Sequence, residues 1–209
     1  SRIGPKFLNA GPGFGGSCFQ KDILNLVYLC RHFGLPDVAD YWESVVALNT
    51  WQQHRIARLV VQKLFGTVTG KRLAILGFAF KADTNDTRES PAIRICRDLL
   101  EEGAQLAIHD PKVTAQQIAR DLQQEASPQP DALSGTGSWA EAGSVEDAVT
   151  GADAVLVLTE WQHYKVLNWM ALAALMRKPA WLFDARAVTD SEQVRAAGLT
   201  LWRVGDGES

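Results

Sequence analysis

Residues 71–110 read KRLAILGFAFKADTNDTRESPAIRICRDLLEEGAQLAIHD, and their pattern indicates the class of fold. Its two short apolar runs, RLAIL and LAIH, have the length of β-strands. Between them, Ser90 and Pro91 are a helix N-cap followed by proline at the first helical position, which predicts a helix over residues 92–102. A strand, a helix and a second strand in this order are typical of the βαβ unit of a parallel sheet.

The alternation continues to the carboxyl end of the chain. Further strands are expected at residues 154–158, 181–183 and 199–203, further helices at 114–123, 168–176 and 191–197, and a short helix capped by Ser144 and Asp147. Residues 125–143, rich in Ser, Pro, Gly and Gln, are expected to form a surface excursion. Apolar strands separated by helices predict an α/β fold, with a Rossmann-like parallel sheet and helices on both faces.

The chain upstream of this sheet has a different pattern. Residues 1–17 are rich in glycine and proline and are expected to be loop. Ser17 is the expected N-cap of a helix over residues 19–32, and a second helical pattern runs over residues 37–65 until Gly66 ends it. The second helix would be about 42 Å long, a length typical of a central helix that bridges domains or packs against a second copy of the chain.

These patterns predict two parts. Residues 1–67 hold the glycine-rich loop and the long helices, and residues 68–209 hold the Rossmann-like sheet.

Composition excludes several classes of protein. The chain has 209 residues, 46% hydrophobic and 22% charged, which is globular composition, and its net charge of −3 gives no basic excess for nucleic acid. No apolar run approaches the roughly 20 residues that span a bilayer, so no membrane segment is expected. The cysteines, Cys18, Cys30 and Cys96, are odd in number and lack metal-ligand spacing, which favours a reduced cytoplasmic protein without a metal site.

Gly11, Gly13 and Gly16 satisfy the G-x-G-x-x-G pattern. The dinucleotide-binding fingerprint also requires a strand before the glycines and an acidic residue at the end of the next strand. Here Phe7 and Leu8 are too short a run to be that strand, and a helix follows, so we reject a dinucleotide site at this position. A flexible turn and a loop whose backbone amides approach a substrate both remain open.

A second possible nucleotide site follows the first strand of the sheet. Gly77 ends that strand and Asp110 ends the next, as in a Rossmann unit, but the turn has one glycine where three are needed. Its bulky, basic sequence suits an aromatic base or a phosphate held by side chains. The carboxyl ends of the strands would bring residues 78–88, 110–112, 159–161 and 184–186 around one crevice, where an anionic ligand is expected.

Cys18 is the candidate nucleophile. It precedes the first helix, where the helix dipole favours a thiolate. Asp22 lies one turn away on the same face, where its charge opposes the thiolate, while Lys21 favours it. Taken alone, a single cysteine before a helix is more often inert, and single charges are more often surface groups than ligands.

Two blocks of sequence together resemble a known family. Residues 13–22, GFGGSCFQKD, and residues 77–90, GFAFKADTNDTRES, are similar to the cysteine motif and the third-domain loop of the UDP-glucose 6-dehydrogenases, within the UDP-glucose/GDP-mannose dehydrogenase family. The resemblance covers practically the whole chain. It implies oxidation of UDP-glucose to UDP-glucuronate with two NAD, in which Cys18 captures the aldehyde as a thiohemiacetal that becomes a thioester, and Asp22 assists proton transfer and activates water.

The resemblance also implies the contacts to substrate and cofactor. The implied substrate-binding residues are Arg2, Phe7, Leu8, Asn9, Gly11, Phe14, Gly15, Phe80, Lys81 and Arg186, and the implied NAD contacts are Lys21 and Arg88. Arg2 matches an arginine that reaches the neighbouring subunit's site. The length of the 37–65 helix separately predicts a homodimer. The main NAD-binding domain of the family lies upstream of residue 1, so we expect a carboxy-terminal fragment that is inactive alone.

Two alternatives stay open. One is a related dehydrogenase acting on GDP-mannose or a UDP-N-acetylhexosamine. The other is a non-catalytic nucleotide-binding or oligomerisation module, in which Cys18 is incidental.

Overall fold

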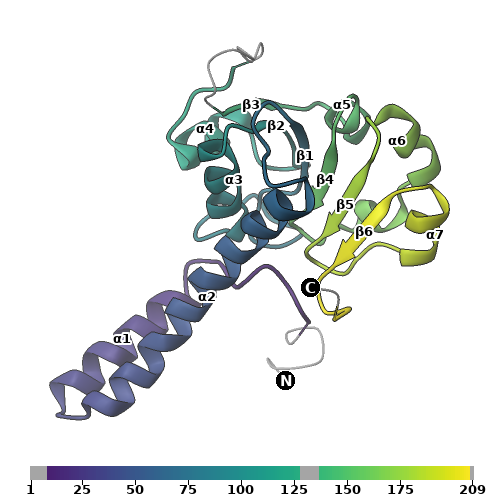
Figure 1. Ribbon diagram of the computed structural model, residues 1–209. Helices are drawn as coiled ribbons and strands as arrows, with labels where there is room; N and C mark the ends of the chain where they lie inside the picture. The colour runs from purple at the N-terminus through teal and green to yellow at the C-terminus, as the bar shows by residue number, and fades with distance from the viewer. Residues whose placement is uncertain (1–8, 128–136, 208–209) are drawn as a thin grey trace.

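The computed structural model describes residues 9–127 and 137–207. A helical hairpin projects from a twisted sheet that helices cover on both sides (Figure 1). The helices are α1 (Phe19–His32), α2 (Pro36–Lys63), α3 (Pro91–Glu101), α4 (Ala115–Leu122), α5 (Val145–Val149), the 3₁₀ helix η2 (Gln162–Val166), α6 (Trp169–Leu175) and α7 (Ser191–Ala196). The strands are β1 (Arg72–Leu76), β2 (Gln105–His109), β3 (Ser138–Glu141), β4 (Ala154–Val157), β5 (Trp181–Asp184) and β6 (Thr200–Arg203).

The six strands form one parallel sheet in the order β3-β2-β1-β4-β5-β6. The chain moves outward from β1 to β3, returns to β4 and moves outward again to β6, so the strand order reverses between β1 and β4. Helix α3 contacts both α2 and α4, and α6 contacts both α5 and α7. This doubly wound arrangement confirms the predicted Rossmann-like fold class, and it brings the carboxyl ends of all strands to one edge.

Local sequence signals explain most element boundaries. The Ser90 side chain accepts a hydrogen bond from Ala92 N, and Ser144 accepts one from Asp147 N, as expected of N-caps. The expected role of Ser17 is wrong, because the N-cap position of α1 is one residue later, at Cys18, and no side chain caps the helix there. That leaves the amide groups of the first turn of α1 without the usual side-chain acceptor.

The expected surface excursion over residues 125–143 is partly wrong. Its last residues form β3, which pairs with β2 at the edge of the sheet. Trp139 is the buried residue of β3, and its Nε1 donates to Gln124 O at 3.0 Å. A single buried side chain in four residues gives no period, so the strand depends on pairing rather than on its own pattern.

The hairpin of α1 and α2 has a small core of its own. Ile23, Val27, Cys30 and Ala39 are buried between the two helices. Toward its carboxyl end α2 packs against α3 and joins the main core through residues such as Ile56. No helix within residues 9–127 and 137–207 is both long and apolar enough to cross a membrane.

Candidate functional site

A cavity of about 770 Å³ lies where the glycine-rich loop meets the carboxyl edge of the sheet. It draws residues from that loop, from α1 and α2, and from the segments after β1, β4 and β5. Its lining residues are Asn9, Ala10, Gly11, Gly13, Phe14, Gly15, Phe19, Asn49, Phe80, Lys81, Glu160, Lys165, Arg186, Ala187 and Val188. The cavity is therefore built from segments more than 170 residues apart, as ligand sites at the reversal point of such sheets are.

Amide side chains on α2, of buried Asn49 and half-buried Gln52, position the glycine-rich loop. Asn49 Oδ1 accepts from Phe14 N at 2.8 Å, and Asn49 Nδ2 donates to Phe14 O at 3.0 Å. Gln52 Nε2 donates to Gly11 O at 3.1 Å. The sequence patterns did not identify these residues. The available signal was a polar residue, Asn49, on the largely apolar face of a long helix, where a buried amide must find partners.

The same loop packs tightly against residues 78–90. Gly16 N donates to Arg88 O at 2.9 Å. A Cβ added at Gly15 would collide with Glu89 O, and one at Gly16 would lie 3.0 Å from the Phe80 ring. These glycines therefore allow a close approach between two parts of the protein. The loop is held in place at this point, unlike the flexible turn that was one of the two open interpretations.

Arg186 connects the end of β5 to the loop after β1. Its Nε donates to Leu158 O at 2.8 Å, and its Nη2 donates to Phe80 O at 3.0 Å. Its Nε also lies 3.2 Å from Glu160 Oε2, although this ion pair lacks hydrogen-bond alignment. Burial lowers the pKa of Arg186, and the charge of Glu160 opposes that effect. Because arginine stays charged at any physiological pH, the cavity keeps a fixed, oriented guanidinium group.

The position that holds a dinucleotide in a Rossmann unit is filled by side chains of this chain. Asp110 Oδ2 accepts from Phe78 N at 2.7 Å and from Ala79 N at 3.0 Å, and Trp161 Nε1 donates to the same oxygen at 3.2 Å. In a dinucleotide-binding site these two backbone amides would face the pyrophosphate. The carboxylate of Asp110 already accepts their hydrogen bonds, and its negative charge would repel a pyrophosphate. The described residues therefore do not fit NAD at the end of β1. Residues 110–112, expected at the crevice, do not line the cavity.

Three of the predicted site residues lie beside this cavity without lining it. Cys18, Lys21 and Asp22 are exposed at the amino end of α1, next to Phe19, which does line the cavity. Cys18 Sγ lies 3.7 Å from Ser17 Oγ, and its backbone carbonyl accepts from Asp22 N at 2.8 Å. An exposed thiol at this edge is accessible to a ligand that extends from the cavity.

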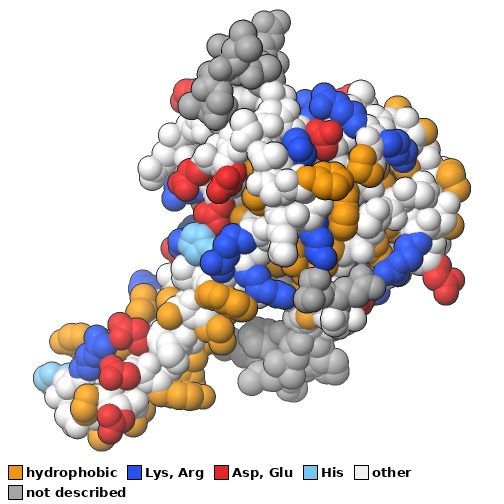
Figure 2. Space-filling model, viewed as in Figure 1, with side chains coloured by type: hydrophobic (Ala, Val, Ile, Leu, Met, Phe, Trp, Pro, Cys, Tyr) orange, Lys and Arg blue, Asp and Glu red, His pale blue; other side chains and the backbone are white. Residues whose placement is uncertain are grey.

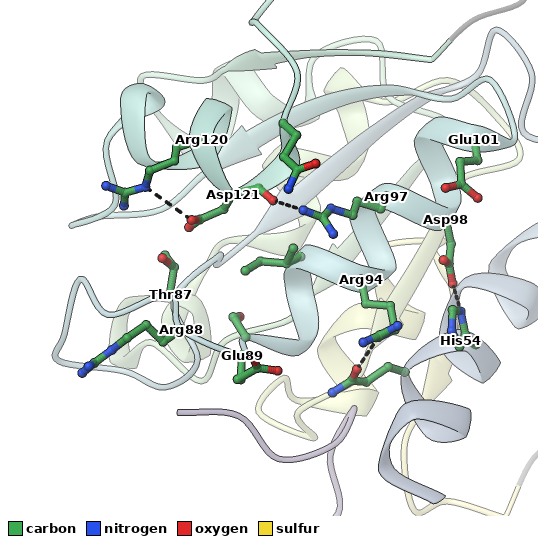
Figure 3. Close-up of a pocket in the computed structure, with 14 residues that line it drawn as sticks. His54, Thr87, Arg88, Glu89, Arg94, Arg97, Asp98, Glu101, Arg120 and Asp121 are labelled. Carbon is green, nitrogen blue, oxygen red and sulfur yellow. Dashed lines mark hydrogen bonds and ion pairs between the residues drawn. The ribbon is translucent and has the colours of Figure 1, made fainter. Parts of the chain in front are cut away.

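Arg88 lines a second, separate cavity of about 550 Å³ between α2, α3 and α4 (Figure 3). Its side chain points outward and donates to Asp86 through Nε at 2.9 Å and Nη2 at 2.7 Å. These hydrogen bonds hold the pKa of Asp86 below its ordinary value. Four arginines and four acidic residues line this second cavity, so its formal charges cancel and give no preference for an anion.

Three further residues predicted to bind substrate, Arg2, Phe7 and Leu8, lie outside the described residues.

Sequence comparisons match both parts of the chain to one family. Residues 74–191 match the UDP binding domain of the UDP-glucose/GDP-mannose dehydrogenase family, and residues 1–51 match its central domain. The chain is 48% identical to UDP-glucose 6-dehydrogenase 4 of Oryza sativa subsp. japonica and 46% identical to UDP-glucose 6-dehydrogenase 1 of Glycine max, each over 98% of the chain. The chain spans 44% of the length of each of these relatives.

The fold is similar to solved structures of the same kind. A UDP-glucose dehydrogenase from Pyrobaculum islandicum superposes with a TM-score of 0.70 and 26% identity, over 97% of this chain and 40% of that one. Because the matched UDP binding domain covers more than half of the chain, these 209 residues belong to the UDP-glucose/GDP-mannose dehydrogenase family.

Proposed function

We propose that this chain is part of a cytoplasmic, NAD-dependent UDP-glucose 6-dehydrogenase that oxidises C6 of UDP-glucose to a carboxylate in two steps. The observation that carries this proposal is that one cavity gathers most of the residues implied for the substrate. These are Asn9, Gly11, Phe14, Gly15, Phe80, Lys81 and Arg186. The high identity to the rice enzyme supports the choice of substrate.

The proposed chemistry follows from the position of Cys18 beside this cavity. UDP would lie against Phe80, Lys81 and Arg186, which directs the hexose toward the glycine-rich loop and the exposed thiol. The thiolate would add to the sugar aldehyde to give a thiohemiacetal, whose loss of hydride leaves a thioester for water to hydrolyse. Asp22, one turn along α1, is the proposed group for proton transfer and for activating that water.

The proposed hydride acceptor is NAD. Since the amides at the end of β1 are taken by Asp110, we infer that NAD binds mainly to the part of the relatives' length that this chain does not match. Lys21 and Arg88, both exposed and outside the 770 Å³ cavity, are the proposed contacts to it from this chain.

The 209-residue chain should therefore keep substrate binding but lack catalysis. It is expected to bind UDP-glucose, and to bind UDP more tightly than GDP, because Phe80, Lys81 and Arg186 of the cavity lie in the matched UDP binding domain. It is expected to form no NADH when UDP-glucose and NAD are supplied. Titration calorimetry and NADH absorbance measure the two properties. NADH formation would contradict the inferred location of the cofactor, and preference for GDP would favour the GDP-mannose alternative.

We also propose that the chain forms a homodimer through the α1–α2 hairpin. Large apolar side chains remain exposed along it (Figure 2), including Tyr28, Phe33, Tyr41, Leu48 and Trp51. Exposed apolar surface of this extent is typical of a protein–protein interface. Sedimentation of the chain at micromolar concentration should show a dimer, and Tyr41→Glu should shift it toward monomer. A parent chain that sediments as a monomer would count against the interface.

A further inference from the structure

The 770 Å³ cavity contains a cation to which our sequence analysis gave no role. Lys165 lies in η2, the short 3₁₀ helix after β4, and lines the cavity together with Lys81 and Arg186. Glu160 is the single acidic residue among the lining residues that the structure describes. The four side chains differ in how much of their charge is available to a ligand.

Most of the guanidinium group of Arg186 binds other groups of the protein rather than being available to a ligand. Its Nε and Nη2 donate to the backbone oxygens of Leu158 and Phe80. Its charge is offset by Glu160 at 3.2 Å, and its side chain is only 16% exposed. Its Nη1 lies 3.7 Å from the position that a Cβ would take on Gly11, another residue that lines the cavity. Arg186 can thus orient a ligand, but the Arg186–Glu160 pair contributes almost no net charge.

The two lysines have the opposite character. Both ammonium groups are on exposed residues, and neither forms an ion pair with another residue in the described ranges. Lys81 Nζ lies 5.4 Å from the centre of the Phe80 ring, a position that keeps the charge beside an aromatic face. The net positive charge of the cavity therefore comes from Lys81 and Lys165.

We propose that Lys165 is a further substrate-binding residue, which with Lys81 binds the diphosphate of the nucleotide sugar. Each phosphate of a diphosphate diester carries one negative charge, so the two lysines match its charge. This inference rests on the proposed binding of a UDP-sugar in this cavity. It assigns charge neutralisation to the lysines and orientation to Arg186.

The test is a titration of the 209-residue chain with UDP, UMP and uridine, in the parent and in Lys165→Met. The substitution is expected to weaken UDP binding by roughly tenfold, the value of a charge-assisted contact, and to leave uridine binding unchanged. It should also reduce the salt dependence of UDP binding, because one fewer charge pair is screened. Lys165→Arg should retain most of the affinity.

The matched control is Lys178→Met, which removes the same charge from an exposed lysine in the turn before β5, away from the cavity. If the parent binds UDP and both methionine variants bind it equally well, the role of Lys165 is wrong while the proposed UDP site stands. If the parent binds no UDP at all, the proposed function fails and this inference fails with it. Thermal unfolding of each variant checks that the fold is retained.

Discussion

Replacing Cys18 by alanine is expected to lower turnover of UDP-glucose by about 10³-fold or more in a full-length dehydrogenase that contains this chain. The reason is that, in the proposed mechanism, the second oxidation needs a covalent thiohemiacetal, and no other described cysteine is exposed. UDP-glucose affinity and the melting temperature should stay close to those of the parent, since Cys18 is exposed and does not line the cavity. Steady-state kinetics measure the turnover, and calorimetry measures the affinity and the melting temperature.

Cys30→Ala is the matched control for the loss of a thiol. Cys30 is buried between α1 and α2, so its replacement should lower stability through lost packing and leave turnover per folded molecule unchanged. Turnover in Cys18→Ala within a few-fold of the parent would show that the cysteine is incidental, as the non-catalytic alternative requires.

Gly77→Ala is expected to destabilise the chain by about 3 kcal/mol, the sum of backbone strain and overpacking. Gly77 ends β1 at φ +95°, a conformation that residues with a side chain rarely adopt. A Cβ there would collide with the side chain of Thr159 and lie 2.8 Å from Thr159 N. Thr159 cannot move away easily, because it is fully buried and its hydroxyl donates to Ala79 O at 2.6 Å. Urea unfolding measures the change.

Gly151→Ala separates the two causes. Gly151 also has a positive φ, +68°, but a Cβ there would meet nothing within 4 Å. Its replacement should therefore cost only the backbone term, about 1 kcal/mol. Equal decreases in the free energy of unfolding of the two variants would mean that the close contact between the added Cβ and Thr159 has no cost.

The order of strands and helices in the sheet could be predicted because local signals agree with the fold. Apolar runs end at glycine or aspartate, and Ser90 with Pro91 begins α3 where a cap should be. The edge strand β3 could not be predicted, because its one buried residue, Trp139, gives no alternation. The N-cap at Ser17 was wrong because the loop before α1 is held by Asn49 and not by a local cap.

The candidate site could be predicted in part. Motif resemblance pointed to Phe80, Lys81 and Arg186, which the fold brings to one cavity. It did not identify Asn49 or Lys165. A polar residue on the apolar face of α2 indicates that Asn49 is buried, but it does not indicate which loop Asn49 binds. The neighbours of Asn49 and Lys165 in the cavity lie far away in sequence, so only the three-dimensional arrangement reveals them.

A crystal structure of the chain with UDP-glucose would show where each part of the nucleotide sugar binds. We expect the diphosphate between Lys81 and Lys165, and the hexose along the glycine-rich loop with C6 within about 3.5 Å of Cys18 Sγ, as a near-attack geometry requires. Density for the nucleotide in the arginine-lined cavity between α2, α3 and α4, or a hexose whose C6 points away from that sulfur, would contradict this arrangement.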